Sequence, residues 1–254
     1  TLAFGTMDSF LLWRLTGGSQ HLTDSTNACR TLLFNIHKMA WSEELTTLFE
    51  VPQHALPTVK PNTADFGLTA PGLLPKELPI AAMAGDQHAA TFGQACFDAG
   101  MVKSTYGTGC FAVLNTGKTP VPSGNGLLTT LAYHTYETPA YALEGSIFVA
   151  GAGVQWLRDA LGLINTAAET EEMAKAADNQ IGDGKTGDLY LVPAFAGLGA
   201  PWWDSAAKGT LVGMTLDTNK DAFAHAMLES VCYQSHDLLT AMAADHGRAV
   251  KEVR

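Results

Sequence analysis

Basic residues are scarce in this chain of 254 residues, which has 15 Lys and Arg against 25 Asp and Glu and a formal net charge of −10. No basic run or stripe is present, which argues against a nucleic-acid partner, because such partners need a positively charged face. The acidity gives no attraction to anionic membranes. No apolar run approaches the ~20 residues that a membrane-spanning helix requires, so we expect no membrane insertion.

Cysteine is also sparse, and no two of the four cysteines form a C-x-x-C pair. We predict buried free thiols in a reducing compartment, hence a cytoplasmic protein. The eight histidines lack the close spacing of a zinc motif, so we assign no metal ligand among them. The cysteines are Cys29, Cys96, Cys110 and Cys232.

Hydrophobic residues make up 46% of the chain and charged residues 16%, which is enough apolar material for a packed core. Periodicity predicts a mixed α/β protein with a hairpin-rich middle segment. We expect helices at 7–16, after Trp41, at 87–97, 147–161, 167–178 and 219–245. We expect strands at 78–84, 101–106, 110–115, 127–133, 141–144 and 189–192, and a loop at 52–76.

Local signals mark several helix ends. Thr6, Ser42 and Thr218 are predicted N-caps, the last through its capping-box spacing to Asp221, and Gly247 is predicted to end the longest helix. A domain boundary is expected near 95–102. The chain opens without methionine, and its last residues alternate like the start of a strand, so we expect a fragment of a longer protein.

The run Ala84-Gly85-Asp86-Gln87 is the first candidate site. An acidic residue at the carboxyl end of a buried strand lies where open α/β sheets bind ligands, and there it can accept the proton of an attacking hydroxyl. Gln87 offers a polyol both a donor and an acceptor. Alternatively, Asp86 only caps the following helix, which stabilises it by ~1 kcal/mol; spacing alone slightly favours this alternative.

Two glycine-containing segments are candidates for phosphate or nucleotide contacts. Gly107-Thr108-Gly109 reads as a hairpin turn whose N–H groups can form a phosphate-binding nest, although an ordinary turn is the commoner meaning. Glu144-Gly145-Ser146 leads to Gly151, Gly153 and Gln155 at the start of a helix, where the small residues let a ligand approach the backbone closely. Tight helix packing explains the small residues equally well.

Two further signals are weaker. Gly184-Lys185-Thr186 lacks the preceding glycine of a P-loop and is predicted to be a solvated turn. Trp202 and Trp203 lie in a Gly-rich loop, and we expect at least one of them in the core.

Stretches distributed along the whole chain form one ordered pattern: 4–13, 23–36, 84–87, 106–111, 125–130, 141–145, 155–159 and 192–195. In this order they resemble the FGGY family of carbohydrate kinases. The runs Tyr-Gly-Thr-Gly-Cys-Phe (106–111) and Asn-Gly-Leu-Leu-Thr-Thr (125–130) resemble the members that phosphorylate glycerol rather than those acting on pentuloses or gluconate.

The resemblance implies an actin-like, ribonuclease-H-like ATPase fold of two domains, both incomplete here, with residues 1–97 in the substrate domain and 98–254 in the nucleotide domain. It implies ATP-dependent phosphorylation of glycerol with Mg²⁺. Asp86 would be the catalytic base and a glycerol contact, as would Gln87 and Phe111. Thr108, Gly151 and Gln155 would contact the nucleotide, and no metal ligand is assigned. These implied roles replace the alternatives given above, a helix cap for Asp86 and an ordinary hairpin turn for Thr108.

The resemblance also implies missing parts. The family's first phosphate loop and part of its glycerol pocket would precede Thr1, and its adenosine motif would follow Arg254, so we expect little activity from this chain alone. Two alternatives remain open: another FGGY sugar kinase acting on a pentulose or gluconate, or a non-catalytic actin-like nucleotide-binding module. A homo-oligomer is compatible with the sequence.

Overall fold

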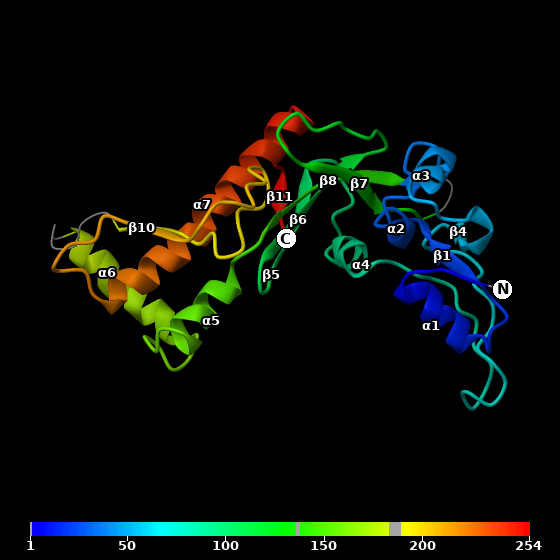
Figure 1. Ribbon diagram of the computed structural model, residues 1–254, viewed down its shortest axis with the longest axis horizontal. Coiled ribbons are helices and arrows are strands. Elements are labelled where there is room, and N and C mark those ends of the chain that lie inside the picture. Colours follow the sequence, from blue (N-terminus) through cyan, green and yellow to red (C-terminus); the bar gives the residue numbers. More distant parts are fainter. Residues whose placement is uncertain (1, 136–137, 183–188) are drawn as a thin grey trace.

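The computed structural model describes residues 2–135, 138–182 and 189–254. A five-stranded sheet lies at the centre, with the N-terminal helices on one side and the C-terminal helices on the other (Figure 1). None of the helices in these ranges is both long enough and apolar enough to cross a membrane.

The N-terminal part consists of short elements joined by long connections. Two small sheets hold it together: β1 pairs with β4 in parallel, and β2 pairs with β3 as an antiparallel hairpin. The elements are α1 (Met7–Leu15), β1 (Leu22–Asp24), α2 (Ser25–Ala28), β2 (Phe34–Asn35), β3 (Ala40–Trp41), α3 (Glu43–Leu48), the 3₁₀ turn Gln53–Ala55, β4 (Thr58–Lys60) and α4 (Asp86–Gly93).

The central sheet has the strand order β11-β5-β6-β8-β7. Its pairs are antiparallel except β11, which lies parallel to β5. The strands are β5 (Met101–Tyr106), β6 (Cys110–Gly117), β7 (Leu128–Tyr133), β8 (Ala140–Ile147) and β11 (Glu252–Val253). The remaining elements are α5 (Gly151–Asp159), α6 (Glu169–Gly182), β9 (Tyr190–Val192), β10 (Thr210–Val212) and α7 (Lys220–His246).

The central sheet presents two different faces, because side chains alternate along each strand. One face packs against α7 and forms the main core, in which Leu114 and Leu143 contact a cluster that includes Leu238 and Met242. The other face carries Lys103, Val113 and Glu144 in one row of paired residues and Thr105, Phe111 and Ser146 in the next. We call this second surface the polar face of the sheet. Helix α4 contacts β5 and β7 of the same sheet.

Most sequence predictions of elements are confirmed. Helices begin or end within a few residues of their expected positions, and Gly107-Thr108-Gly109 is the hairpin turn between β5 and β6. The expected terminal strand is β11. Ser42 caps α3 by accepting from the Leu45 N–H, and Gly247 ends α7 in the left-handed conformation with φ 70°.

The expected buried strand at 78–84 is wrong. The segment forms only isolated bridges, Thr63 with Ala82 and Leu68 with Pro79, and most of its residues are exposed. An apolar run becomes a buried strand only when neighbouring strands cover it, and the described residues supply none. The predicted loop at 52–76 was also incomplete, because it contains β4.

Several smaller predictions need correction. Asn219 rather than Thr218 caps α7, because its side chain accepts from the N–H groups of Asp221 and Ala222. Trp202 and Trp203 are 60% and 44% exposed, so neither is a core residue. Strand β9 is short and only its middle residue is buried. The predicted turn at 184–186 lies outside the described residues.

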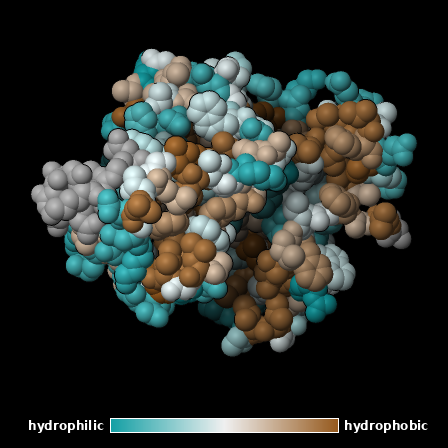
Figure 2. All heavy atoms as spheres, turned by 60° about the vertical axis from the view of Figure 1, so that its left-hand side comes forward, coloured by the Kyte–Doolittle hydropathy of each residue, from teal (hydrophilic) through white to brown (hydrophobic). Residues whose placement is uncertain are grey.

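All four cysteines are free, as expected, but Cys232 is exposed rather than buried and Cys29 is only partly covered. Apolar side chains also reach the surface elsewhere, for instance Met7 (70% exposed) and Phe10 (55% exposed) on α1. Figure 2 shows such apolar surface in several separate patches. Patches of this kind commonly mark surfaces that contact other protein segments.

Candidate active site

Asp86 is the first residue of α4 and is exposed at the helix N-terminus. Its Oδ1 accepts from the Gln87 backbone N–H at 2.7 Å, and a carboxylate at this position is favoured by the helix dipole. The Gly85 N–H donates to Thr26 Oγ1 at 3.0 Å, which fixes the start of the helix against α2. Asp86 therefore owes its position to the helix start and not to a buried strand.

Gln87 follows on α4 and is half-buried. Its Oε1 accepts a hydrogen bond from Lys103 Nζ on β5. Lys103 is only 1% exposed. Burial lowers the pKa of its ammonium, and the negative charges of Asp86 and Glu144 oppose this shift. The pair joins the first turn of α4 to the polar face of the sheet.

Phe111 lies on that same face of β6, two residues from Val113, which is the partner of Lys103. It is paired with Thr105 on β5 and with Ser146 on β8, and its ring is 41% exposed. Antiparallel partners project to the same side, so Phe111 and the lysine that binds Gln87 share one surface. The structure thus brings Phe111 and, through Lys103, Gln87 to one side of the sheet, with Asp86 next to Gln87 at the start of α4.

Glu144 is a buried carboxylate on this face, 4% exposed. Arg30, which follows α2, donates to both of its oxygens, Nη1 to Oε2 at 2.6 Å and Nη2 to Oε1 at 2.8 Å. Such bidentate pairs are stronger and more directional than single contacts. Next to them, His88 of α4 is 4% exposed, and burial, reinforced by the Arg30 charge, lowers the pKa of its imidazole to about 4.

The predicted nucleotide residues gather at the hairpin that joins β5 and β6. The turn 107–109 packs directly on the start of α5: Gly151 N–H donates to the Gly107 carbonyl at 2.9 Å, and Ala150 and Ala152 N–H groups donate to the Thr108 carbonyl. A Cβ on Gly151 would lie 2.6 Å from the Gly107 oxygen. Tight packing therefore requires Gly151, and these helix N–H groups serve the turn.

A pocket of about 380 Å³ lies beside this junction. Gly151, Gln155 and Arg158 of α5 line it, together with Thr170 of α6. Gln155 is exposed, so its amide is accessible to a ligand. Two of the predicted nucleotide residues, Gly151 and Gln155, thus border one pocket. Thr108 does not line it, but its carbonyl oxygen accepts from the N–H groups on either side of Gly151.

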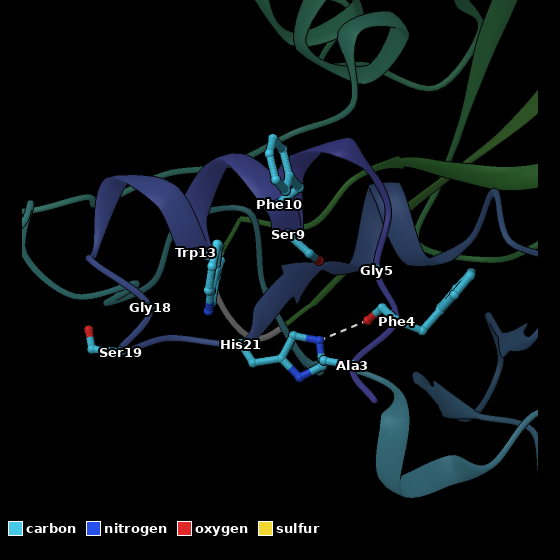
Figure 3. Close-up of a pocket in the computed structure, with 9 residues that line it drawn as sticks. All are labelled: Ala3, Phe4, Gly5, Ser9, Phe10, Trp13, Gly18, Ser19 and His21. Carbon is cyan, nitrogen blue, oxygen red and sulfur yellow. Dashed lines mark hydrogen bonds between the residues drawn. The ribbon is translucent and has the colours of Figure 1, made fainter. Parts of the chain in front are cut away.

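Another pocket, of about 530 Å³, lies on the N-terminal part between α1 and the segment 18–21 (Figure 3). Phe10 and Trp13 project from α1, and His21 Nε2 contacts the Phe4 carbonyl oxygen at 2.8 Å. The side-chain oxygen of Ser9 is buried there without a hydrogen-bond partner among the described residues. None of the predicted site residues lines this pocket.

Sequence reasoning did not single out Lys103 or His88, and it included Glu144 only as the start of the segment that leads to Gly151, without its pairing to Arg30. Because fully buried lysines are rare, the sequence alone predicts an exposed Lys103, and its burial becomes visible only in the folded sheet. The roles of Glu144 and His88 depend on their burial and on the nearby Arg30, which only the folded structure reveals. In the described ranges, no group of three or more His, Cys, Asp or Glu is arranged to hold a metal ion.

Comparison with known proteins now defines the class. Residues 2–93 match the N-terminal domain and residues 102–254 the C-terminal domain of the FGGY family of carbohydrate kinases, and the chain belongs to this family. Its fold is accordingly the actin-like, ribonuclease-H-like ATPase fold, as predicted.

Individual relatives are similar over almost the whole chain. The glycerol kinase of Methylobacterium nodulans is 59% identical over 244 residues, which is 96% of this chain and 47% of the relative. That of Alcanivorax borkumensis is 60% identical over 246 residues, 97% of this chain and 48% of the relative. The chain thus spans about half the length of the curated relatives it matches.

Solved structures give the same picture. Plasmodium falciparum glycerol kinase with ADP superposes with a TM-score of 0.89 at 37% identity, covering 99% of this chain and 49% of that one. A gluconate kinase from Lactobacillus acidophilus superposes with a TM-score of 0.82 at 20% identity, covering 99% and 50%; at that identity the likeness concerns the fold alone.

Proposed function

We propose that this chain is the central part of a glycerol kinase, which transfers the γ-phosphoryl group of ATP to glycerol and forms sn-glycerol 3-phosphate. The observation that carries the proposal is the 59% identity, over 96% of this chain, to a relative named as a glycerol kinase. The gathering of Gln87 and Phe111 on one side of the sheet, with Asp86 at the helix start beside them, supports it.

In this proposal Asp86 is the general base. Its exposed carboxylate takes the proton of a terminal glycerol hydroxyl, and that oxygen attacks the γ-phosphorus in line. Gln87 binds a second hydroxyl, and the exposed Phe111 ring packs on the carbon backbone of glycerol. Positioning of this kind accounts for most of the catalysis in phosphoryl transfer, because the protein has little covalent chemistry to perform.

The nucleotide is proposed to bind along the 380 Å³ pocket at Gly151 and Gln155, with the Thr108 turn near its phosphates. Gly151 lines this pocket, but its lack of a side chain is explained by the close contact with the Gly107 carbonyl oxygen, so the accessible amide of Gln155 is the stronger support for this role. Mg²⁺ usually combines one or two carboxylates with phosphate oxygens and water. We therefore propose that it accompanies the nucleotide phosphates, where it would neutralise developing charge, and we assign it no ligand set in this chain.

The same proposal divides the chain into a substrate-domain part, 1–97, and a nucleotide-domain part, 98–254. Because the relatives are about twice as long, we propose that this chain alone has little activity and that the exposed apolar face of α1 packs against further parts of the whole protein. A cytoplasmic location is proposed because the four cysteines are free thiols. Homo-oligomers remain compatible with this proposal.

Two alternative functions remain candidates. A pentulose or gluconate kinase would share this fold, but such neighbours are only 19–22% identical, far below the glycerol kinases. A non-catalytic nucleotide-binding module would keep the pocket at Gln155 but would have no use for an exposed carboxylate beside Gln87.

The test is a coupled assay of ADP release on a protein of the relatives' full length that contains this chain. Glycerol, xylulose and gluconate are compared with a no-acceptor control. We expect glycerol to give the highest kcat/KM by at least about 10²-fold, the scale on which a site built for particular hydroxyls rejects poor analogues. A preference for xylulose or gluconate, or ADP release that no acceptor stimulates, would contradict the proposal. The isolated 254-residue chain is assayed in parallel, and normal turnover by it would refute the expected inactivity.

A further inference from the structure

Lys103 is an unusual residue for its position. It lies in the middle of β5 with Val102 before it, it pairs with Val113 on β6, and its side chain is almost fully buried. An apolar side chain would fill this place at lower cost, because a buried ammonium loses its hydration. The nitrogen is placed so that it donates to the Gln87 side-chain oxygen.

This contact determines how the Gln87 amide is turned. An ammonium group has three donors and no acceptor, so it can bind only the oxygen of an amide. With Oε1 held by Lys103, the Nε2 group must point elsewhere, as a donor. Without Lys103 the amide can rotate by half a turn and present its oxygen instead, since the two ends have nearly the same shape.

We propose that Lys103 is a positioning residue that orients the Gln87 amide, so that Nε2 donates to the glycerol hydroxyl next to the one that Asp86 deprotonates. The inference rests on the proposed function and deepens it. A hydroxyl that receives this hydrogen bond is held by its oxygen, and its proton is free to bind elsewhere. Lys103 acts through Gln87 and does not itself touch the substrate.

The contact also crosses the family's domain division. Gln87 belongs to the part that matches the N-terminal domain and Lys103 to the part that matches the C-terminal domain. The orientation of the amide therefore depends on how α4 sits on β5. A substrate contact on one domain is fixed by a charge that the other supplies.

The first experiment replaces Lys103 by methionine, which has similar length and no charge, in the full-length protein. Loss of a hydrogen bond to a charged group, together with misorientation of the amide, should raise KM for glycerol by about tenfold to a hundredfold. KM for ATP should stay within about twofold, because the nucleotide pocket contains neither residue. Lys175→Met is the matched control, since Lys175 is an exposed residue of α6, and it should change neither constant.

The second experiment separates positioning from a general structural role by a double-mutant cycle. In a Gln87→Ala background there is no amide to orient, so Lys103→Met should raise KM for glycerol by less than about twofold further. Thermal unfolding of each variant checks that the proteins compared are folded. Additive losses, or an equal rise in KM for ATP, would show that Lys103 merely supports the fold. An unmodified protein that fails to turn over glycerol would instead overturn the proposed function and this inference together.

Discussion

Arg30 and Glu144 form a bidentate ion pair that joins the two parts of the molecule, with N–O distances of 2.6 and 2.8 Å. Arg30 belongs to the segment that matches the N-terminal family domain and Glu144 to the one that matches the C-terminal domain. The arginine side chain is 42% exposed, whereas that of the glutamate is only 6% exposed. The buried carboxylate therefore depends on a partner that comes from the other side of the domain division.

Replacing Arg30 by alanine should lower the free energy of unfolding of this chain by about 1–3 kcal/mol, because it leaves the Glu144 carboxylate buried and unpaired. The loss is smaller than for a fully buried pair, since Arg30 is partly exposed. Urea titration measures it. Arg158→Ala is the control: its pair with Asp159 is exposed on both sides and should contribute less than about 1 kcal/mol. Equal midpoints for the two variants would contradict the prediction.

Replacing Asp86 by asparagine in the full-length protein should lower kcat by about 10²–10⁴, the usual contribution of a general base, while the affinity for ATP stays unchanged. The amide keeps the size of the side chain but cannot take the proton. Steady-state kinetics and nucleotide binding together test this. Asp65→Asn is a matched control, because its exposed side chain only accepts from the Gly67 N–H. Retained turnover in the Asp86 variant would favour the non-catalytic module.

Replacing Gly151 by alanine should disturb the junction between the 107–109 turn and α5. The new methyl group would lie 2.6 Å from the Gly107 carbonyl oxygen, so one backbone segment must move, at a cost of about 1–3 kcal/mol. KM for ATP should rise as well, if the pocket beside Gly151 binds the nucleotide. Gly93→Ala is the control, because nothing lies within 4 Å of its added Cβ. If urea unfolding showed the Gly151 variant to be as stable as the original protein, the predicted clash with Gly107 would be contradicted.

Replacing Asn219 by alanine should destabilise α7 by about 1 kcal/mol, because two N–H groups at the helix start lose their acceptor. Thr218→Ala is the informative comparison. The sequence pattern makes Thr218 the cap, whereas in the structure its hydroxyl oxygen accepts from the Thr215 N–H in the preceding turn, so its loss should cost less. Urea unfolding of the two variants discriminates between these assignments.

What the sequence predicted well is local. The hairpin at 107–109, the cap at Ser42 and the stop at Gly247 depend on the residues within one turn, and all are found as expected. Gln87 was also identified, but the reason for its orientation was not, because Lys103 lies sixteen residues away on another element. The sequence pattern places Asp86 at the end of a buried strand, although burial of residues 78–84 would require neighbouring strands that the described chain lacks.

His88 should make the stability of the chain depend on pH. Its pKa falls from 6.5 to about 4 in the folded state, chiefly through burial, and its Nδ1 has no hydrogen-bond partner among the described residues. Above pH 6.5 the imidazole is neutral in both states and the full stability is present. Between about pH 6.5 and 4 only the unfolded chain takes up the proton, so the free energy of unfolding should fall by about 3 kcal/mol over this window.

The test compares urea unfolding of the original chain and of His88→Leu between pH 7 and pH 4. Other groups also titrate in this range, so the informative quantity is the difference between the two pH slopes. That difference should be close to one proton, with the variant showing the weaker dependence, since a leucine cannot bind the proton that pulls the equilibrium towards the unfolded state. His236→Leu, which alters an exposed imidazole, is the matched control. Parallel slopes for the original chain and the His88 variant would mean that the buried imidazole is protonated equally in both states, which its lack of solvent and of a hydrogen-bond partner argues against.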